Sequence, residues 1–379
     1  MRSYRLLSIW GIPIRVNTSL LIFLPILAWL IGSGGQIETY AGLIGRLTGV
    51  EFDLARLRAG SMPWLVGVVA AVGLFVSVTV HELGHSWVAM RYGIEIESIT
   101  LWILGGLASL KTFPKEWNRE FWIAIARPVS SLLVAVVCYV AVLVMPESLQ
   151  IPRFVAGWLA IVNVTLAVFN LLPAFPMDGG RILRALLARS RPYGTATRLA
   201  ARVGVGFAFL FAIVAVLNFQ IILLLLAFFI YSAATTESKA VLLDELLEGI
   251  TVGDIMTHDP ARVTMSTTLD EFGGQMLRDR QTTYLVTDTG GTPVGLVTLD
   301  DLKKARRGDR ETATVGEIMR DVPSVDSAAD AFETLARLQG PGGIYALVQR
   351  DGELLGILSE ADYAHAMTIQ RGFRSGIGG

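Results

Sequence analysis

Two histidines separated by three residues, His81 and His85, stand in an apolar stretch of the chain, with Glu82 directly after the first. The stretch predicts a helix, and residues four apart share a helix face, so both imidazoles can reach one metal ion. This spacing, with a glutamate beside the first histidine, is typical of a Zn²⁺ site in which the glutamate acts as general base. We therefore interpret His81 and His85 as zinc ligands and Glu82 as the base. The alternative is a pair of histidines that hydrogen-bond to neighbouring helices.

A third ligand is expected, because a catalytic zinc usually takes three protein ligands and keeps a fourth position for water. Asp178 is the best candidate, at the end of a later apolar run in which Pro173 and Pro176 should break the helix. Free backbone groups at membrane depth are tolerated only where they are buried in protein or line a wet cavity. An acid at this depth is costly, and binding to zinc would account for it. The alternative for Asp178 is a helix cap before Gly179.

The elements that must position these residues are membrane spans. About 20 apolar residues cross a bilayer, and four such runs are clear. They cover residues 18–32, 64–90, 121–145 and 154–172. The run at 199–234 is too long for one crossing, and the polar residues 218–220 divide it, so six spans are expected. We expect the first span to stay in the mature protein, because no small-residue cleavage site follows it.

The character of the 379-residue chain changes near residue 240. Only 11 of its 33 acidic residues precede that point, and the remainder alternates polar and apolar residues like a soluble fold. We predict a polytopic α-helical membrane domain at 1–240, followed by a soluble α/β module with parts at 241–308 and 309–379. The net charge of −1 averages two unlike parts, and no basic patch indicates nucleic-acid binding. The single cysteine, Cys138, excludes disulfides within the chain and cysteine-based metal clusters.

Lysines and arginines predict the orientation in the cell membrane, because cytoplasmic loops carry their excess. They gather on the side of the N-terminus, whereas the opposite loops have few or balance them with acids. The N-terminal side holds Arg2, Arg5, Arg15, Arg91, Lys111, Lys115, Arg119, Arg181, Arg184, Arg189, Arg191 and Arg198. Both termini are therefore expected in the cytosol.

Residues 95–110 alternate polar and apolar side chains up to Gly105 and Gly106, which favours an extended hairpin between the second and third spans. An edge strand there could hold a substrate peptide through main-chain hydrogen bonds. An interfacial loop is the alternative.

These motifs resemble those of the site-2 proteases, polytopic membrane proteins with a zinc active site. The resemblance covers residues 11–14, His81 to His85, residues 104–107 and Asn170 to Arg181. It implies His81, His85 and Asp178 as zinc ligands and Glu82 as the base that activates water. It also implies that the Asn170 amide contacts the substrate backbone or the developing oxyanion, although a bond between helices would explain Asn170 equally simply.

The chain departs from that family at Arg127, before Pro128 in the third span, where the family often has a small residue. An arginine in a span is costly. It could face the catalytic cavity, bind a substrate carbonyl or pair with an acid.

An internal repeat marks the last 130 or so residues, because Val252 to Thr257 recurs as Val315 to Arg320. Each copy is expected to run strand, helix, strand, strand, helix. The repeats resemble tandem CBS domains, which implies that hydroxyl and carboxylate pairs contact the ribose of an adenine nucleotide such as AMP or ATP. These pairs are Thr298 with Asp301, and Ser359 with Asp362. Helix N-terminal caps in a nucleotide-free dimer module are the alternative, and a homodimer through these domains is left open.

The combined interpretation is a zinc metalloendopeptidase that cleaves transmembrane segments of protein substrates within the lipid bilayer, in regulated intramembrane proteolysis. Adenine nucleotide at the CBS domains would modulate it. One rival is a CBS-regulated transporter or channel, which accounts for the C-terminal module but leaves His81, His85 and Asp178 without a role. A second rival is a zinc-binding membrane sensor without catalysis, against which the intact Glu82 argues.

Overall fold

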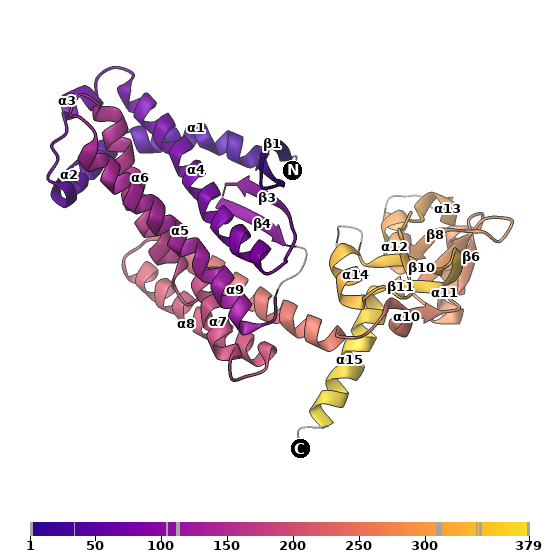
Figure 1. The fold of residues 1–379 in the computed structure, drawn as a ribbon. Helices are drawn as coiled ribbons and strands as arrows, with labels where there is room; N and C mark the ends of the chain where they lie inside the picture. The colour runs from indigo at the N-terminus through magenta and orange to yellow at the C-terminus, as the bar shows by residue number, and fades with distance from the viewer. Residues whose placement is uncertain are drawn as a thin grey trace. The chain divides into compact units, whose positions relative to one another are not determined.

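The computed structural model describes residues 3–33, 35–103, 105–110, 114–307, 313–338, 340 and 343–376. The chain forms two compact units, Met1–Lys239 and Ala240–Gly379 (Figure 1). Each unit has its own apolar core and is described separately.

Long apolar helices dominate the first unit. Among the described residues, five helices are long and apolar enough to cross a membrane. They are α4 (Met62–Arg91), α5 (Trp117–Val144), α6 (Gln150–Asn170), α8 (Tyr193–Leu217) and α9 (Ile221–Leu247). The shorter α1 (Thr18–Gly32) and α2 (Gln36–Thr48) make a sixth span if they are counted together. The prediction of about six spans is confirmed, and the break between α8 and α9 falls at the polar residues expected to divide the long run.

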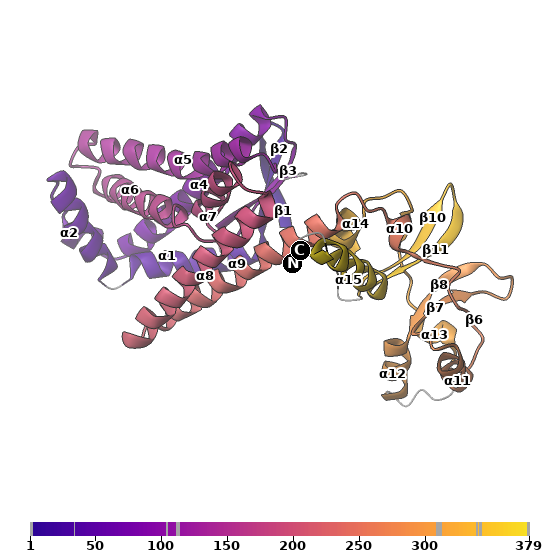
Figure 2. The same cartoon turned by 90° about the horizontal axis from the view of Figure 1, so that it is seen from below.

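Helices α4, α5 and α6 lie side by side, and α1 packs on α4 (Figures 1 and 2). Small residues allow the close approach that membrane helices need. A Cβ atom on Gly67 would overlap the backbone of Ala28 in α1, and one on Gly157 in α6 would lie 2.7 Å from the Ile44 side chain of α2. A short helix, α3 (Leu54–Leu57), follows α2, and α7 (Asp178–Ala188) packs against α5 and α8.

A four-stranded sheet accompanies these helices, in the order β1 (Ser3–Ile9), β2 (Ile12–Asn17), β3 (Ile96–Trp102) and β4 (Gly105–Leu110). Strands β3 and β4 form an antiparallel hairpin, as expected for residues 95–110, and β4 is an edge strand. Leu104 lies outside the described residues. Strand β3 also pairs in parallel with β2, and β2 pairs antiparallel with β1, two strands that the sequence pattern did not predict.

The second unit contains the predicted repeat as two small mixed sheets. The first contains β6 (Arg262–Thr264), β7 (Thr283–Thr287) and β8 (Pro293–Thr298). The second contains β5 (Thr257–His258), β11 (Glu353–Ser359), β10 (Tyr345–Arg350) and β9 (Ser324–Asp326) in that order. The helices are α10 (Val252–Ile255), α11 (Leu269–Asp279), α12 (Leu299–Arg307), α13 (Val315–Ile318), α14 (Ala331–Leu338) and α15 (Glu360–Gly376). Equivalent strands pair alike in the two sheets, parallel for the first two and antiparallel for the last two.

Candidate active site

Helix α4 presents His81, Glu82 and His85 toward the interior of the first unit, with exposed fractions of 4%, 2% and 3%. The close packing of α5 contributes to this burial. A Cβ atom on Gly84 would lie 2.7 Å from Ser130 Oγ and 3.0 Å from the Ala126 carbonyl oxygen, both in α5. Only glycine fits there without a shift of the neighbouring helix. Gly84, between the two histidines, therefore allows α4 to pack closely against α5.

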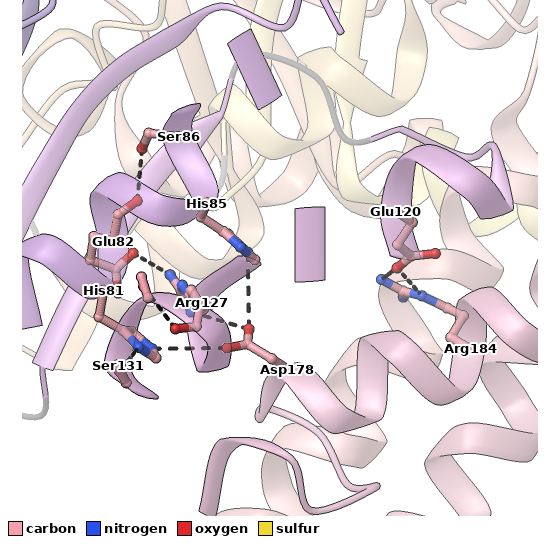
Figure 3. A network of polar contacts seen from close by, with 10 residues as sticks. His81, Glu82, His85, Ser86, Glu120, Arg127, Ser131, Asp178 and Arg184 are labelled. Atoms are coloured by element: carbon pink, nitrogen blue, oxygen red, sulfur yellow. Dashed lines mark hydrogen bonds and ion pairs between the residues drawn. The ribbon is translucent and has the colours of Figure 1, made fainter. Parts of the chain in front are cut away.

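Asp178 reaches the histidines from the first residue of α7 and is 1% exposed. Its Oδ2 atom lies 3.9 Å from His81 Nε2, and its Oδ1 atom lies 3.9 Å from His85 Nε2 (Figure 3). The chain between α6 and α7 contains Pro173 and Pro176, and it is irregular, as predicted. A Cβ atom on Gly179 would overlap the backbone at the end of α6, so a glycine directly after Asp178 allows α7 to begin beside that end.

The chemistry of these three side chains fits a zinc ion. His85 Nε2 and Asp178 Oδ2 are buried atoms with no hydrogen-bond partner within the described ranges. Buried polar atoms normally have partners, and two imidazoles with one carboxylate are a ligand set that zinc accepts. No three His, Cys, Asp or Glu side chains of the described residues are arranged to enclose a metal as they stand. The 3.9 Å separations place one Asp178 oxygen beside each histidine, so these three side chains would hold the ion between them.

Arg127 of α5 lies beside the same cluster (Figure 3). One guanidinium nitrogen contacts Glu82 Oε2, and the other donates to Asp178 Oδ1 at 3.4 Å. Of the roles open to this arginine, the structure therefore gives it pairing with acids, and it pairs with two at once.

Ser131, one turn after Arg127, was missed by the sequence interpretation. Its Oγ atom lies 2.7 Å from His81 Nδ1, and the serine is fully buried. A partner on Nδ1 orients the imidazole so that Nε2 faces the position of a metal. The four-residue spacing of two polar residues in an apolar span was the signal that could have revealed it, because such residues share one helix face.

Asn170 is the last residue of α6, and its amide donates to the Leu166 carbonyl of the same helix at 2.9 Å. Among the described residues, no hydrogen bond joins it to His81, Glu82 or Asp178. Its proposed contact with substrate thus stays a prediction.

A second buried ion network lies near the histidines. Arg184 of α7 donates from Nε to Glu120 of α5 at 2.7 Å and from Nη1 to Glu237 of α9 at 2.6 Å. Its guanidinium also lies over the rings of Phe175 and Tyr193, 5.0 and 4.9 Å from their centres. The network fastens α7, and hence Asp178 at its first residue, to two long helices.

The four residues expected to contact a nucleotide lie at the starts of two helices of the second unit. Thr298 donates from its backbone nitrogen and its hydroxyl to Asp301 Oδ2, at 3.0 and 2.6 Å. Ser359 and Asp362 form the same pair of bonds, both at 2.7 Å. These are capping interactions of α12 and α15, the arrangement that the simpler alternative predicted.

Asp301 has a further partner in Arg320, whose Nε atom donates to it at 2.7 Å. The hydrogen bonds to Asp301 raise the pKa of Arg320 above its usual value. The same guanidinium lies 5.3 Å from the ring centre of Tyr345, which belongs, like Arg320, to the second repeat. The two repeats are therefore joined through Arg320 at the position expected to bind ribose.

Comparison with known proteins follows the same division of the chain. The model of peptidase family M50 matches residues 69–153 and 148–213, which contain both histidines, Glu82 and Asp178. The CBS domain model matches residues 252–308 and 315–368.

Relatives match over nearly the whole chain. A zinc metalloprotease of Methanocaldococcus jannaschii is 32% identical over 372 residues, which cover 97% of this chain and 96% of the relative. Rip3 of Mycobacterium tuberculosis, whose name also places it among zinc metalloproteases, is 31% identical over 95% of this chain and 92% of its own. The solved site-2 protease from M. jannaschii is 34% identical, with a TM-score of 0.41, over 62% of this chain and 95% of that structure. The expected resemblance is confirmed, and the chain belongs to peptidase family M50, the site-2 protease-like zinc metalloproteases, with a C-terminal pair of CBS domains.

Proposed function

We propose that this metalloprotease hydrolyses peptide bonds inside membrane-spanning segments of other proteins, as in regulated intramembrane proteolysis. The observation that carries the proposal is the approach of the Asp178 carboxylate to both histidines, at 3.9 Å, beside Glu82. The histidines and Glu82 belong to α4, and Asp178 follows the end of α6, and both helices are long enough to cross a bilayer. A substrate would therefore meet the site at membrane depth.

In this proposal His81, His85 and Asp178 hold one zinc ion per chain. Zinc, when bound, polarises the scissile carbonyl and makes an attacking water more acidic. Glu82 accepts the proton of that water and delivers it to the leaving amine, which makes it first a base and then an acid. Asn170 would contribute by donating its amide to the carbonyl oxygen as negative charge develops, which requires it to leave the Leu166 carbonyl.

The edge strand β4 is the proposed docking site for substrate. A Cβ atom on Gly106 would overlap the Glu82 side chain, so the backbone of β4 runs directly beside the general base. A peptide that adds to the free edge of β4 as a further strand would be extended, as hydrolysis requires, and would pass close to Glu82. The substrate helix must unwind locally to bind in this way.

Both termini are proposed to lie in the cytosol, which would expose the CBS unit to nucleotides. We propose that AMP or ATP binds this unit through Thr298, Asp301, Ser359 and Asp362 and modulates cleavage. The equivalent placement of the two hydroxyl–carboxylate pairs in the repeats supports this. Because Asp301 already accepts from Arg320, a ribose must share or displace that bond. Pairing of two copies through these domains remains part of the proposal.

The experiment is cleavage of a fluorescent transmembrane peptide in proteoliposomes by the parent and by Glu82→Gln. Glutamine keeps the shape of the side chain but cannot accept the proton, so cleavage should cease while zinc is retained. Ser86→Ala, one turn further along α4, is the matched control, because the Ser86 hydroxyl only donates to the Glu82 carbonyl at 3.0 Å. Full cleavage by Glu82→Gln would reject the proposed mechanism.

A further inference from the structure

Arg127 is the feature of the site that the proposed mechanism leaves without a role. Its guanidinium contacts Glu82 Oε2 with one nitrogen and Asp178 Oδ1 with the other, at 3.4 Å (Figure 3). It therefore bridges the proposed base and a proposed metal ligand. Its Nε atom is buried without a hydrogen-bond partner within the described ranges. The two terminal nitrogens of the guanidinium make these contacts, so the carboxylates of Glu82 and Asp178 fix its position.

The two oxygens of Asp178 are placed differently by this contact. Oδ1 lies 3.9 Å from His85 Nε2 and also accepts from Arg127, whereas Oδ2 faces His81 and accepts no hydrogen bond from any described residue. A metal bound by the three ligands would thus compete with Arg127 for one oxygen. It would also sit near a fixed positive charge, and repulsion between like charges is strong in a site shielded from water.

Glu82 has the opposite relation to Arg127. Glu82 directly follows a proposed liganding histidine, and a carboxylate that joined the metal as a fourth ligand would close the position that catalysis keeps open for water. The contact with Arg127 occupies Glu82 Oε2 and restrains the carboxylate on the α5 side of the cluster.

We propose that Arg127 is a positioning residue that sets the coordination of the metal site. Because it restrains Glu82, Arg127 keeps the number of protein ligands on the metal at three. Because it shares Asp178 with the metal, it keeps the zinc affinity below the value that the three ligands would give without it. The proposal rests on the proposed zinc site. A purely structural ion pair would predict the reverse, because loss of Arg127 would then loosen Asp178 and weaken binding.

The test compares zinc affinity of the purified full-length protein, by competition with a chromophoric chelator, for the parent, Arg127→Gln and Arg127→Lys. We expect Arg127→Gln to bind zinc at least about tenfold more tightly. Lysine keeps the positive charge but cannot contact both carboxylates at once. The zinc affinity of Arg127→Lys should therefore lie between those of the parent and Arg127→Gln. Arg119→Gln is the matched control: it removes a charge from the same helix, but Arg119 pairs with Glu116 at 3.5 Å, at the surface.

The absorption spectrum of the Co²⁺-substituted protein gives a readout of coordination. Arg127→Gln should change the visible bands as Glu82 joins the metal, and the double variant Glu82→Gln/Arg127→Gln should restore the parent bands. Equal or weaker zinc affinity in Arg127→Gln, with unchanged Co²⁺ bands, would overturn the proposal. If Arg127→Gln does not fold, the zinc affinity of Arg127→Lys tests the proposal instead, and an affinity equal to that of the parent would overturn it. Zinc retained by His81→Ala would instead reject the zinc site itself, which keeps the two failures apart.

Discussion

Ser131→Ala removes the hydroxyl group that lies against the Nδ1 atom of His81. The bond is 2.7 Å long and lies in a fully buried position. Without it, Nδ1 is left unsatisfied in an apolar setting, or the ring rotates and Nε2 turns away from Asp178. We therefore expect weaker zinc binding while the helices remain in place.

The magnitude follows from the burial. Loss of one partner of a buried hydrogen bond costs about 1–3 kcal/mol. Since about 1.4 kcal/mol is a factor of ten, zinc affinity should fall by about 5- to 140-fold. The expected loss is at the lower end if a water can take the place of the hydroxyl.

Ser130→Ala is the matched control, because it deletes the same group one residue earlier. The Ser130 hydroxyl donates to the Arg127 carbonyl at 2.8 Å, within its own helix. The assay is chelator competition on both purified variants, with thermal unfolding as a check on the fold. Parent-like zinc affinity in Ser131→Ala, or an equal loss in both variants, would refute the reasoning that Ser131 orients His81.

Three further predictions concern the hairpin, the second ion network and the CBS unit. Gly106→Ala should reduce cleavage strongly with zinc retained, because its Cβ would overlap Glu82, whereas Gly93→Ala, where nothing lies within 4 Å of a Cβ, should affect only local backbone strain. Arg184→Met should lower the free energy of unfolding by about 3–5 kcal/mol, seen in thermal melts, since it leaves Glu120 buried without its partner; parent-like melts would contradict this. Hydrogen bonds from Thr251 hold the pKa of Asp254 below its usual value of 3.8. The pKa of Asp254 is thus lower in the folded than in the unfolded protein. The stabilisation that its charged carboxylate gives is therefore complete at a pH above the unfolded pKa, and it is lost as the pH falls through the folded pKa. The Thr251 amide should therefore exchange its hydrogen more slowly in the parent than in Asp254→Asn at neutral pH, and the two rates should converge in acid. A difference that stays constant with pH would contradict this prediction.

The sequence predicts those features that depend on local spacing. His81 and His85 share a helix face by their separation alone, the apolar runs predict the spans, and the repeat predicts the two similar sheets. Asp178 could be singled out because an acid in an apolar region is costly unless a metal or a cation compensates its charge.

Long-range pairing accounts for what could not be predicted. Strands β1 and β2 are recognisable only once β2 pairs with β3, about 80 residues later in the chain. The partners of Arg127 and Ser131 lie on α4 and α7, and helix periodicity says nothing about which helices are neighbours. The capping bonds of Thr298 and Ser359 show a different limit, because one hydroxyl–carboxylate spacing serves both a helix cap and a ribose contact.

The most direct test of the account is the zinc content of the detergent-purified protein beside Asp178→Ala and His81→Ala, measured by mass spectrometry of the metal. The account predicts about one zinc per chain in the parent and little in either variant, because both remove one of three ligands. Full zinc occupancy in Asp178→Ala would contradict the three-ligand site, and with it the link between α4 and α7 on which the proposed mechanism depends.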